Sequence, residues 1–184
     1  MKQVKGSMAV TIIKNIKTSP KGLGPYNQIL SDKAKELLNR RILAGSWYPY
    51  DAYRECFDAL CLIEAKNNPK TLTEWGLNES KVWLSTVYQS TIDKGNLQAL
   101  TTQYTRFHRL VFNFGEIIAK FLSDTEIEFT YVDLPRDWSN YYYIALGWII
   151  SFVEATVNKK VDYVFLNKSW ERGGWTKLKF SWSP

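Results

Sequence analysis

The chain has 184 residues, is 45% hydrophobic and 15% aromatic, and carries a net charge of +6. A chain of this length buries about two-thirds of its unfolded surface in one core, so we expect one domain over residues 1–184. Its two cysteines, Cys56 and Cys61, exclude a disulfide framework and a cysteine-rich zinc site, since five residues along a helix place them on different faces. No stretch approaches the ~20 apolar residues of a membrane span, and we expect a cytoplasmic protein without a transmembrane segment.

The positive charge is concentrated near the N-terminus, where residues 1–25 read as a basic leader. Residues 1–41 contain nine Lys or Arg against two acidic residues. Such a region can contact nucleic acid or an acidic membrane surface. A solvated basic face is the simpler interpretation, because the lysines are spread out and no nucleic-acid motif surrounds them. Nucleic acid is therefore not the partner that we expect, and the role of this basic third stays open.

Residues 26–114 are expected to form a helical subregion. Apolar residues recur there with the spacing of amphipathic helices. A capping box at Thr71–Glu74 predicts a short helix that breaks at Gly76, and glycine at position 95 predicts the end of the next one. A further short strand or helix is expected over residues 9–16. Within the first of these helices, Ser31–Asp32 offers a cap or a break, and the fourth begins at Asn78 or Ser80. The predicted helices cover residues 26–43, 50–65, 71–76, 78–95 and 97–112.

After Gly115 the pattern changes to the alternation of β-strands, and residues 115–184 are expected to form a sheet subregion. In the segment Glu126–Asp133, Ile127, Phe129 and Tyr131 alternate with polar residues, which places one face of the strand in the core. The order of elements predicts an α+β fold, with a helical half followed by a four-stranded antiparallel sheet built as strand-strand-helix-strand-strand. The predicted elements are strands 117–122 and 126–133, helix 140–157, and strands 161–166 and 175–182.

Catalytic constellations are not evident in the sequence. A hydroxyl or thiol nucleophile needs a base within reach, and the chain has one histidine, His108. The segment Gly22–Gly24 lacks the Lys-Ser/Thr of a phosphate-binding loop. Glu126 and Glu128 resemble a carboxylate pair, but alternation places both on the solvated face of a strand. We therefore predict no catalytic residue, and a protein that is not an enzyme.

His108 is the one residue with ligand chemistry of its own. It lies on the apolar side of its predicted helix, one turn from Tyr104 and from Val111. A neutral imidazole that faces a cavity can ligate a metal or haem. A lone histidine among aromatic residues also fits a hydrogen-bonded core position, and we expect no metal site.

Several aromatic residues with polar ring atoms fall on inward stripes or at helix starts. Buried N–H and O–H groups need partners, which favours a pocket with polar handles. A plain aromatic core is the alternative. The set comprises Trp47, Tyr48, Tyr53, Trp83, Tyr104 and Trp148.

Four motifs along the chain resemble a known group of proteins. They are KGS at Lys5–Ser7, SWYPYDAY at Ser46–Tyr53, GW at Gly147–Trp148 and FSW at Phe180–Trp182. Together they are similar to an uncharacterised bacterial family of the haem-nitric-oxide-binding-like superfamily, over nearly the whole chain. That superfamily also includes the four-vinyl-reductase-like sensing domains and the TRAPP transport-particle subunits. The resemblance implies a haem-nitric-oxide-binding-like fold.

The resemblance also implies where a haem would bind. Haem-binding members carry a proximal histidine on the last helix before the sheet and a Tyr-x-Ser-x-Arg motif that holds the propionates. His108 and Tyr131 match the histidine and the tyrosine, but Asp133 replaces the serine, Pro135 replaces the arginine, and Arg136 comes one place late. An aspartate repels propionates and a displaced arginine loses its bidentate fork. Haem held by His108 is therefore the alternative, and no cofactor is the main expectation.

The resulting functional hypothesis is a non-enzymatic signalling sensor or adaptor that holds a small hydrophobic ligand between the helical half and the inner face of the sheet. It acts through a protein partner or a homodimer. One alternative is a haem-based gas sensor that uses His108, and another is a ligand-free dimeric protein-interaction module. The residues predicted to bind the ligand are Trp47, Tyr53, Trp83, Tyr104, His108, Tyr131 and Trp148.

Overall fold

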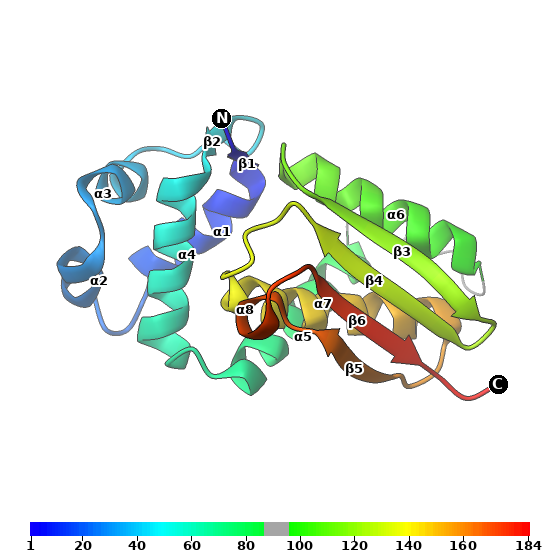
Figure 1. Cartoon of the computed structure of the whole chain (residues 1–184). Coiled ribbons are helices and arrows are strands. Elements are labelled where there is room, and N and C mark those ends of the chain that lie inside the picture. The colour runs from blue at the N-terminus through cyan, green and yellow to red at the C-terminus, as the bar shows by residue number, and fades with distance from the viewer. Residues whose placement is uncertain (87–95) are drawn as a thin grey trace. The chain divides into compact units, whose positions relative to one another are not determined.

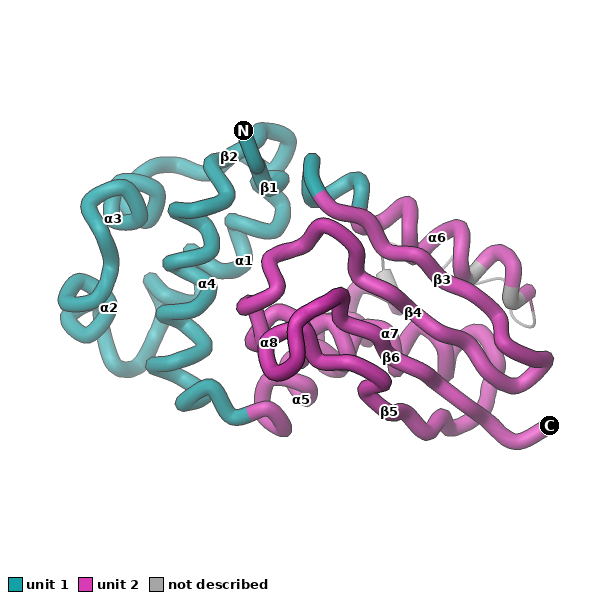
Figure 2. The backbone as a smooth tube through the Cα atoms, in the orientation of Figure 1, with its two compact units in different colours: residues 1–68, 109–114 teal, residues 69–108, 115–184 magenta. Residues whose placement is uncertain are grey.

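The computed structural model describes residues 1–86 and 96–184 and divides into two compact units (Figure 2). Unit 1 comprises residues 1–68 and 109–114, and unit 2 comprises residues 69–108 and 115–184. Unit 1 contains 12 Lys or Arg and six Asp or Glu, whereas unit 2 contains 12 of each. The whole net charge of the chain therefore belongs to unit 1.

Unit 1 consists of four helices and a short two-stranded sheet. Strand β1 pairs antiparallel with β2, and the apolar sides of the two longest helices form most of the core. One contribution comes from beyond the N-terminal region, because Phe112 forms an isolated bridge with Val4 of β1. The elements are β1 (Gln3–Lys5), α1 (Gly6–Lys17), α2 (Gly24–Ile29), α3 (Asp32–Asn39), β2 (Trp47–Pro49) and α4 (Tyr50–Ala65).

Of the two alternatives for the helical stretch 26–43, the break at Ser31–Asp32 is the one that occurs, because the chain forms two helices there. Leu30 is extended after α2, and the Ser31 hydroxyl accepts a hydrogen bond from the Ala34 N–H at 3.3 Å. A serine at this position satisfies one of the free N–H groups of a new helix. Ser31 therefore begins α3 instead of lying inside a longer helix. Residues 9–16, expected as a strand or a helix, are helical in α1.

A carboxylate anchors the loop between α1 and α2 to α4. Glu64 accepts hydrogen bonds from the Ser19 hydroxyl and the Tyr26 hydroxyl, both at 2.7 Å, and Lys21 lies 3.7 Å from its other oxygen. The bond from Ser19 is the main reason that the pKa of Glu64 is lowered. Burial, together with the bond to Glu64, raises the pKa of Tyr26 to about 12. The tyrosine is therefore a neutral donor to a charged acceptor.

Unit 2 is a four-stranded antiparallel sheet with helices on one face (Figure 1). The strand order is β3-β4-β6-β5, and every neighbouring pair is antiparallel. This confirms the predicted α+β fold and its sheet. The elements are α5 (Pro69–Thr86), α6 (Leu97–Val111, whose last turn is grouped with unit 1), β3 (Glu116–Ser123), β4 (Glu126–Val132), α7 (Ser139–Val157), β5 (Asp162–Asn167), α8 (Ser169–Arg172) and β6 (Thr176–Ser181).

The two faces of the sheet differ as the alternation predicts. Ile127, Phe129 and Tyr131 are each fully buried. On the opposite face, Lys179 lies 2.8 Å from Glu126, and Lys177 lies 3.6 Å from Glu128. Partly exposed ion pairs of this kind stabilise a protein by about 1 kcal/mol or less, so the buried face supplies most of the stability of the sheet.

The predicted helix break at Gly76 is wrong, because α5 continues through this residue to Thr86. Gly76 lies where α5 crosses α7, and a Cβ added there would meet the backbone of Ile144 and, at 3.2 Å, the Cα of Gly147. The glycine is therefore used for close helix packing, and it does not end the helix. The predicted end of a helix at Gly95 lies outside the described residues. None of the helices within residues 1–86 and 96–184 has the length and apolar character needed to cross a membrane.

Candidate ligand site

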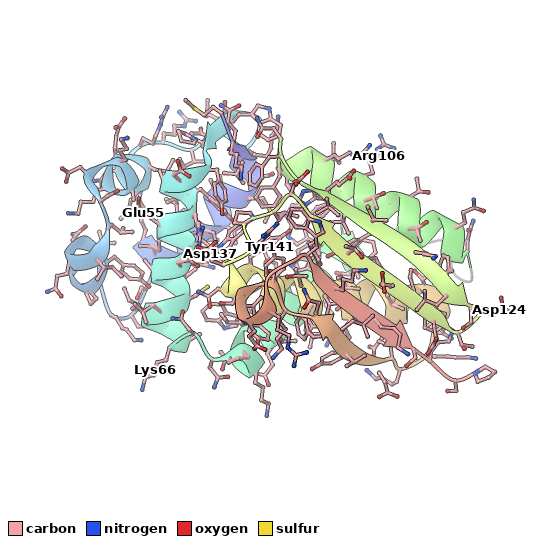
Figure 3. The ribbon with its side chains drawn as sticks, in the orientation of Figure 1. Glu55, Lys66, Arg106, Asp124, Asp137 and Tyr141 are labelled. Atoms are coloured by element: carbon pink, nitrogen blue, oxygen red, sulfur yellow. The ribbon has the colours of Figure 1, made fainter. Side chains whose placement is uncertain are left out.

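Two of the predicted ligand residues, Trp47 and Tyr53, belong to unit 1. Trp47, predicted near a helix start, lies on β2 with its side chain 37% exposed, and the Lys5 ammonium lies 4.7 Å from the centre of its ring. The three-residue strand alternates, so a buried Tyr48 leaves its neighbours on the open side. Tyr53 is buried in α4, with its ring 6.0 Å from that of Phe57. Glu55, which is labelled in Figure 3, lies on the same helix, α4.

The other five belong to unit 2, where α5, α6, β4 and α7 supply them. Tyr104 on α6 and Tyr131 on β4 form the centre of this group. Their hydroxyl oxygens lie 3.3 Å apart, and both side chains are buried. Burial raises the pKa of each phenol well above its ordinary value. The two hydroxyls therefore stay neutral and share one hydrogen bond in an apolar setting.

Aromatic rings enclose this hydroxyl pair. The Tyr104 ring lies edge-on to Phe129 at 5.4 Å and to Phe152 at 5.6 Å. The Tyr131 ring lies edge-on to Tyr142 at 5.3 Å. Edge-to-face pairs at these separations are favourable beyond the area that they bury. The inner face of the sheet, α6 and α7 are joined through these contacts.

A second aromatic group surrounds Trp148 of α7. Phe107 of α6 stacks on it at 5.4 Å, and Trp83 of α5 lies 6.2 Å away. The Trp148 indole N–H donates to the carboxylate of Glu79, and burial raises the pKa of that carboxyl. Sequence reasoning missed Phe107, although it lies one turn after Tyr104, and it missed Glu79, because no pattern marks this half-buried residue as a partner of Trp148.

The hydroxyl of Ser151 lies on α7 one turn after Trp148. Its side chain is 7% exposed, and the hydroxyl has no hydrogen-bond partner among the described residues. Leaving a buried hydroxyl without a partner costs about 1–3 kcal/mol. Natural structures retain such groups where a water, an ion or a ligand completes them. Ser151 therefore offers a polar handle inside the aromatic core.

His108 lies on α6 one turn after Tyr104 and is 2% exposed. An imidazole that ligates haem faces a space large enough for the macrocycle. Tyr104, Tyr131 and Trp148 are 4%, 0% and 7% exposed, so no opening of the size of a macrocycle lies beside these rings. In this arrangement His108 is an enclosed core residue.

The loop after β4 does not provide a propionate clamp. Asp133 takes a left-handed conformation with φ of 55° and is exposed. The carbonyl oxygen of Pro135 accepts a hydrogen bond from the Tyr142 hydroxyl at 3.0 Å. The Arg136 guanidinium lies 4.8 Å from the centre of the Trp175 ring, and its backbone oxygen accepts from Ser169 at 2.8 Å. Together with the enclosed His108, this loop does not fit haem.

No family model and no curated protein sequence matches the chain. Solved structures of H-NOX domains do match. A mutant of T. tengcongensis H-NOX is 16% identical, with a TM-score of 0.64 over 98% of each chain. An oxygen-binding H-NOX domain related to soluble guanylate cyclases is 17% identical, with a TM-score of 0.63 over 98% of this chain and 95% of the other. The chain therefore has the fold of H-NOX domains, as its motifs imply.

Proposed function

We propose that the chain is a non-enzymatic sensor domain that holds a small ligand in the aromatic core of unit 2. The single observation that carries this proposal is the set of polar groups buried within that core. The Tyr104–Tyr131 hydroxyl pair and the Ser151 hydroxyl lie among aromatic rings on α6, β4 and α7. The H-NOX fold supports it, because the similar domain of known structure binds oxygen.

The neighbours favour haem as the ligand to test first, and they support haem-based gas sensing more than a ligand-free adaptor. His108 is the only histidine of the chain and thus its only imidazole ligand. Haem, when bound, would supply an iron centre for a diatomic gas. The residues of this chain argue against haem binding, since Asp133 and Pro135 cannot clamp a propionate and His108 is enclosed.

A haem titration of the purified chain tests whether the ligand is haem. If haem is the ligand, a Soret band appears at one haem per chain and is lost in His108→Ala. Tyr26→Phe is the matched control, because it alters a buried ring in unit 1 and leaves unit 2 intact. A chain that gives no Soret band with excess haem, while its thermal transition stays intact, eliminates the haem version.

The side chains favour a haem-free version, in which the ligand is a small apolar molecule with one hydrogen-bonding group. The apolar body would replace ring contacts around Trp148, and the polar group would complete Ser151. Native mass spectrometry of the protein purified from cells should show a retained small molecule. Ser151→Ala should lower its occupancy, whereas Ser181→Ala on β6 should not. A chain that carries no added mass and binds no apolar probe by thermal shift refutes this version.

A further inference from the structure

Strand β5 is an edge of the sheet in unit 2. An edge strand presents unpaired N–H and C=O groups, and natural proteins protect such edges with charge, proline or a cover. In β5, Tyr163, Val164 and Leu166 are 48%, 46% and 45% exposed. The four residues from Tyr163 to Leu166 contain no charge and no proline. This edge is apolar and uncovered by any described helix (Figure 1).

The opposite edge, β3, is protected. Lys120 lies in the middle of that strand and is exposed, and Glu116 begins it. Both edge strands carry one irregularity of register, between Phe121 and Ser123 in β3 and between Phe165 and Asn167 in β5. Both strands begin with an acidic residue, so the central Lys120 is what distinguishes the two edges, and β5 is the one that can accept another strand.

The charges that flank β5 favour a second copy of the same strand. Asp162 begins the strand and Lys168 follows its last residue. When two copies run antiparallel with Phe165 on the twofold axis, Asp162 of one lies opposite Lys168 of the other. Opposite charges at such positions stabilise a strand pair, and like charges destabilise it.

We propose that β5 is a homodimer interface, in which two copies pair antiparallel along this edge and join their sheets into one of eight strands. Twofold symmetry makes the contact self-complementary, so each Asp162–Lys168 pair occurs twice. Within each copy, the Lys168 ammonium lies 2.9 Å from Glu171 at the surface. There it can also pair with Asp162 of the second copy. The interface needs no ligand and goes beyond the sensing proposed above.

The test measures molar mass by light scattering over a dilution series of the full chain. Wild-type protein should reach twice 21.4 kDa at high concentration and dissociate on dilution. Val164→Lys and Leu166→Lys should keep it monomeric throughout. The matched controls are Ile118→Lys and Leu122→Lys on β3, which are 48% and 44% exposed and should leave the dimer intact. Equal thermal transitions of all variants show that each one folds.

A charge exchange then tests the register. Asp162→Lys and Lys168→Asp should each weaken dimerisation roughly three- to tenfold, and the double exchange should restore it. A wild-type chain that stays monomeric at the highest concentration overturns the proposal. A dimer that is lost in the β3 variants instead of the β5 variants, or that the double exchange fails to restore, overturns it as well.

Discussion

Replacing Gly147 by alanine tests the crossing of α5 and α7. A Cβ at this position would lie 2.6 Å from the Leu77 nitrogen and 2.9 Å from the carbonyl carbon of Gly76, with the Thr73 oxygen closer still. Ordinary contacts between such atoms need about 3.5 Å. All three neighbours are backbone atoms, so no side chain can rotate away. The two helices must therefore separate by on the order of 1 Å.

The change in the free energy of unfolding on Gly147→Ala follows from two opposing effects. Overpacking typically costs about 1–3 kcal/mol, and a clash against backbone belongs at the upper end. Alanine gains about 1 kcal/mol over glycine in a helix interior. The steric cost exceeds this gain, which leaves a net loss of about 2 kcal/mol in the free energy of unfolding. For a chain of this length, that corresponds to a fall of roughly 4–8 °C in Tm.

Urea unfolding followed by tryptophan fluorescence measures this loss, since Trp83 and Trp148 lie beside the crossing. The matched control is Gly45→Ala, because no atom lies within 4 Å of the Cβ that it would add. The double variant Gly76→Ala with Gly147→Ala should cost less than the sum of the two single changes, since one separation of the helices accommodates both methyl groups. If Gly147→Ala is as stable as the wild type, or if the two costs add, the close crossing is not what limits the packing.

Two further variants test the buried hydrogen bonds. The folded pKa of Glu64 is lowered, so its contribution to stability is complete above its ordinary pKa of about 4.5 and is lost as the pH falls through the lowered value. Glu64→Gln should therefore destabilise the chain more at neutral than at strongly acidic pH in urea unfolding, and an equal loss at both contradicts this. Tyr131→Phe removes the partner of the Tyr104 hydroxyl and should cost about 1–3 kcal/mol. The double change of both tyrosines to phenylalanine should cost less than the two single costs together, and full additivity would show that the hydroxyls do not interact.

The sheet of unit 2 was predictable because its alternation has a single explanation. Ile127, Phe129 and Tyr131 are fully buried as expected, and the four antiparallel strands, which follow one another along the chain as predicted, confirm the fold. The ends of helices were harder to predict from the sequence, because local signals compete there. The Ser31 cap outweighed the apolar stripe across α2 and α3, whereas the glycine at position 76 was outweighed by the close packing against Gly147.

The candidate site was only partly predictable. Apolar stripes and a motif mark Tyr104, Tyr131 and Trp148 in the sequence, and the structure places these three residues within one unit. The exposure of Trp47 could not be predicted, because a strand of three residues is too short for its pattern to show which side is buried. Partners such as Glu79 depend on which helices cross, and that is tertiary information.

The division of charge described for the two units determines how the chain responds to an electric field. Unit 1 carries the entire charge of +6, and unit 2 carries none. An anionic surface therefore attracts unit 1 through its net charge, whereas unit 2 responds only through the distribution of its balanced charges. Salt at physiological concentration limits this attraction to about 8 Å. Unit 1 is therefore the part of the chain whose net charge responds to the salt concentration.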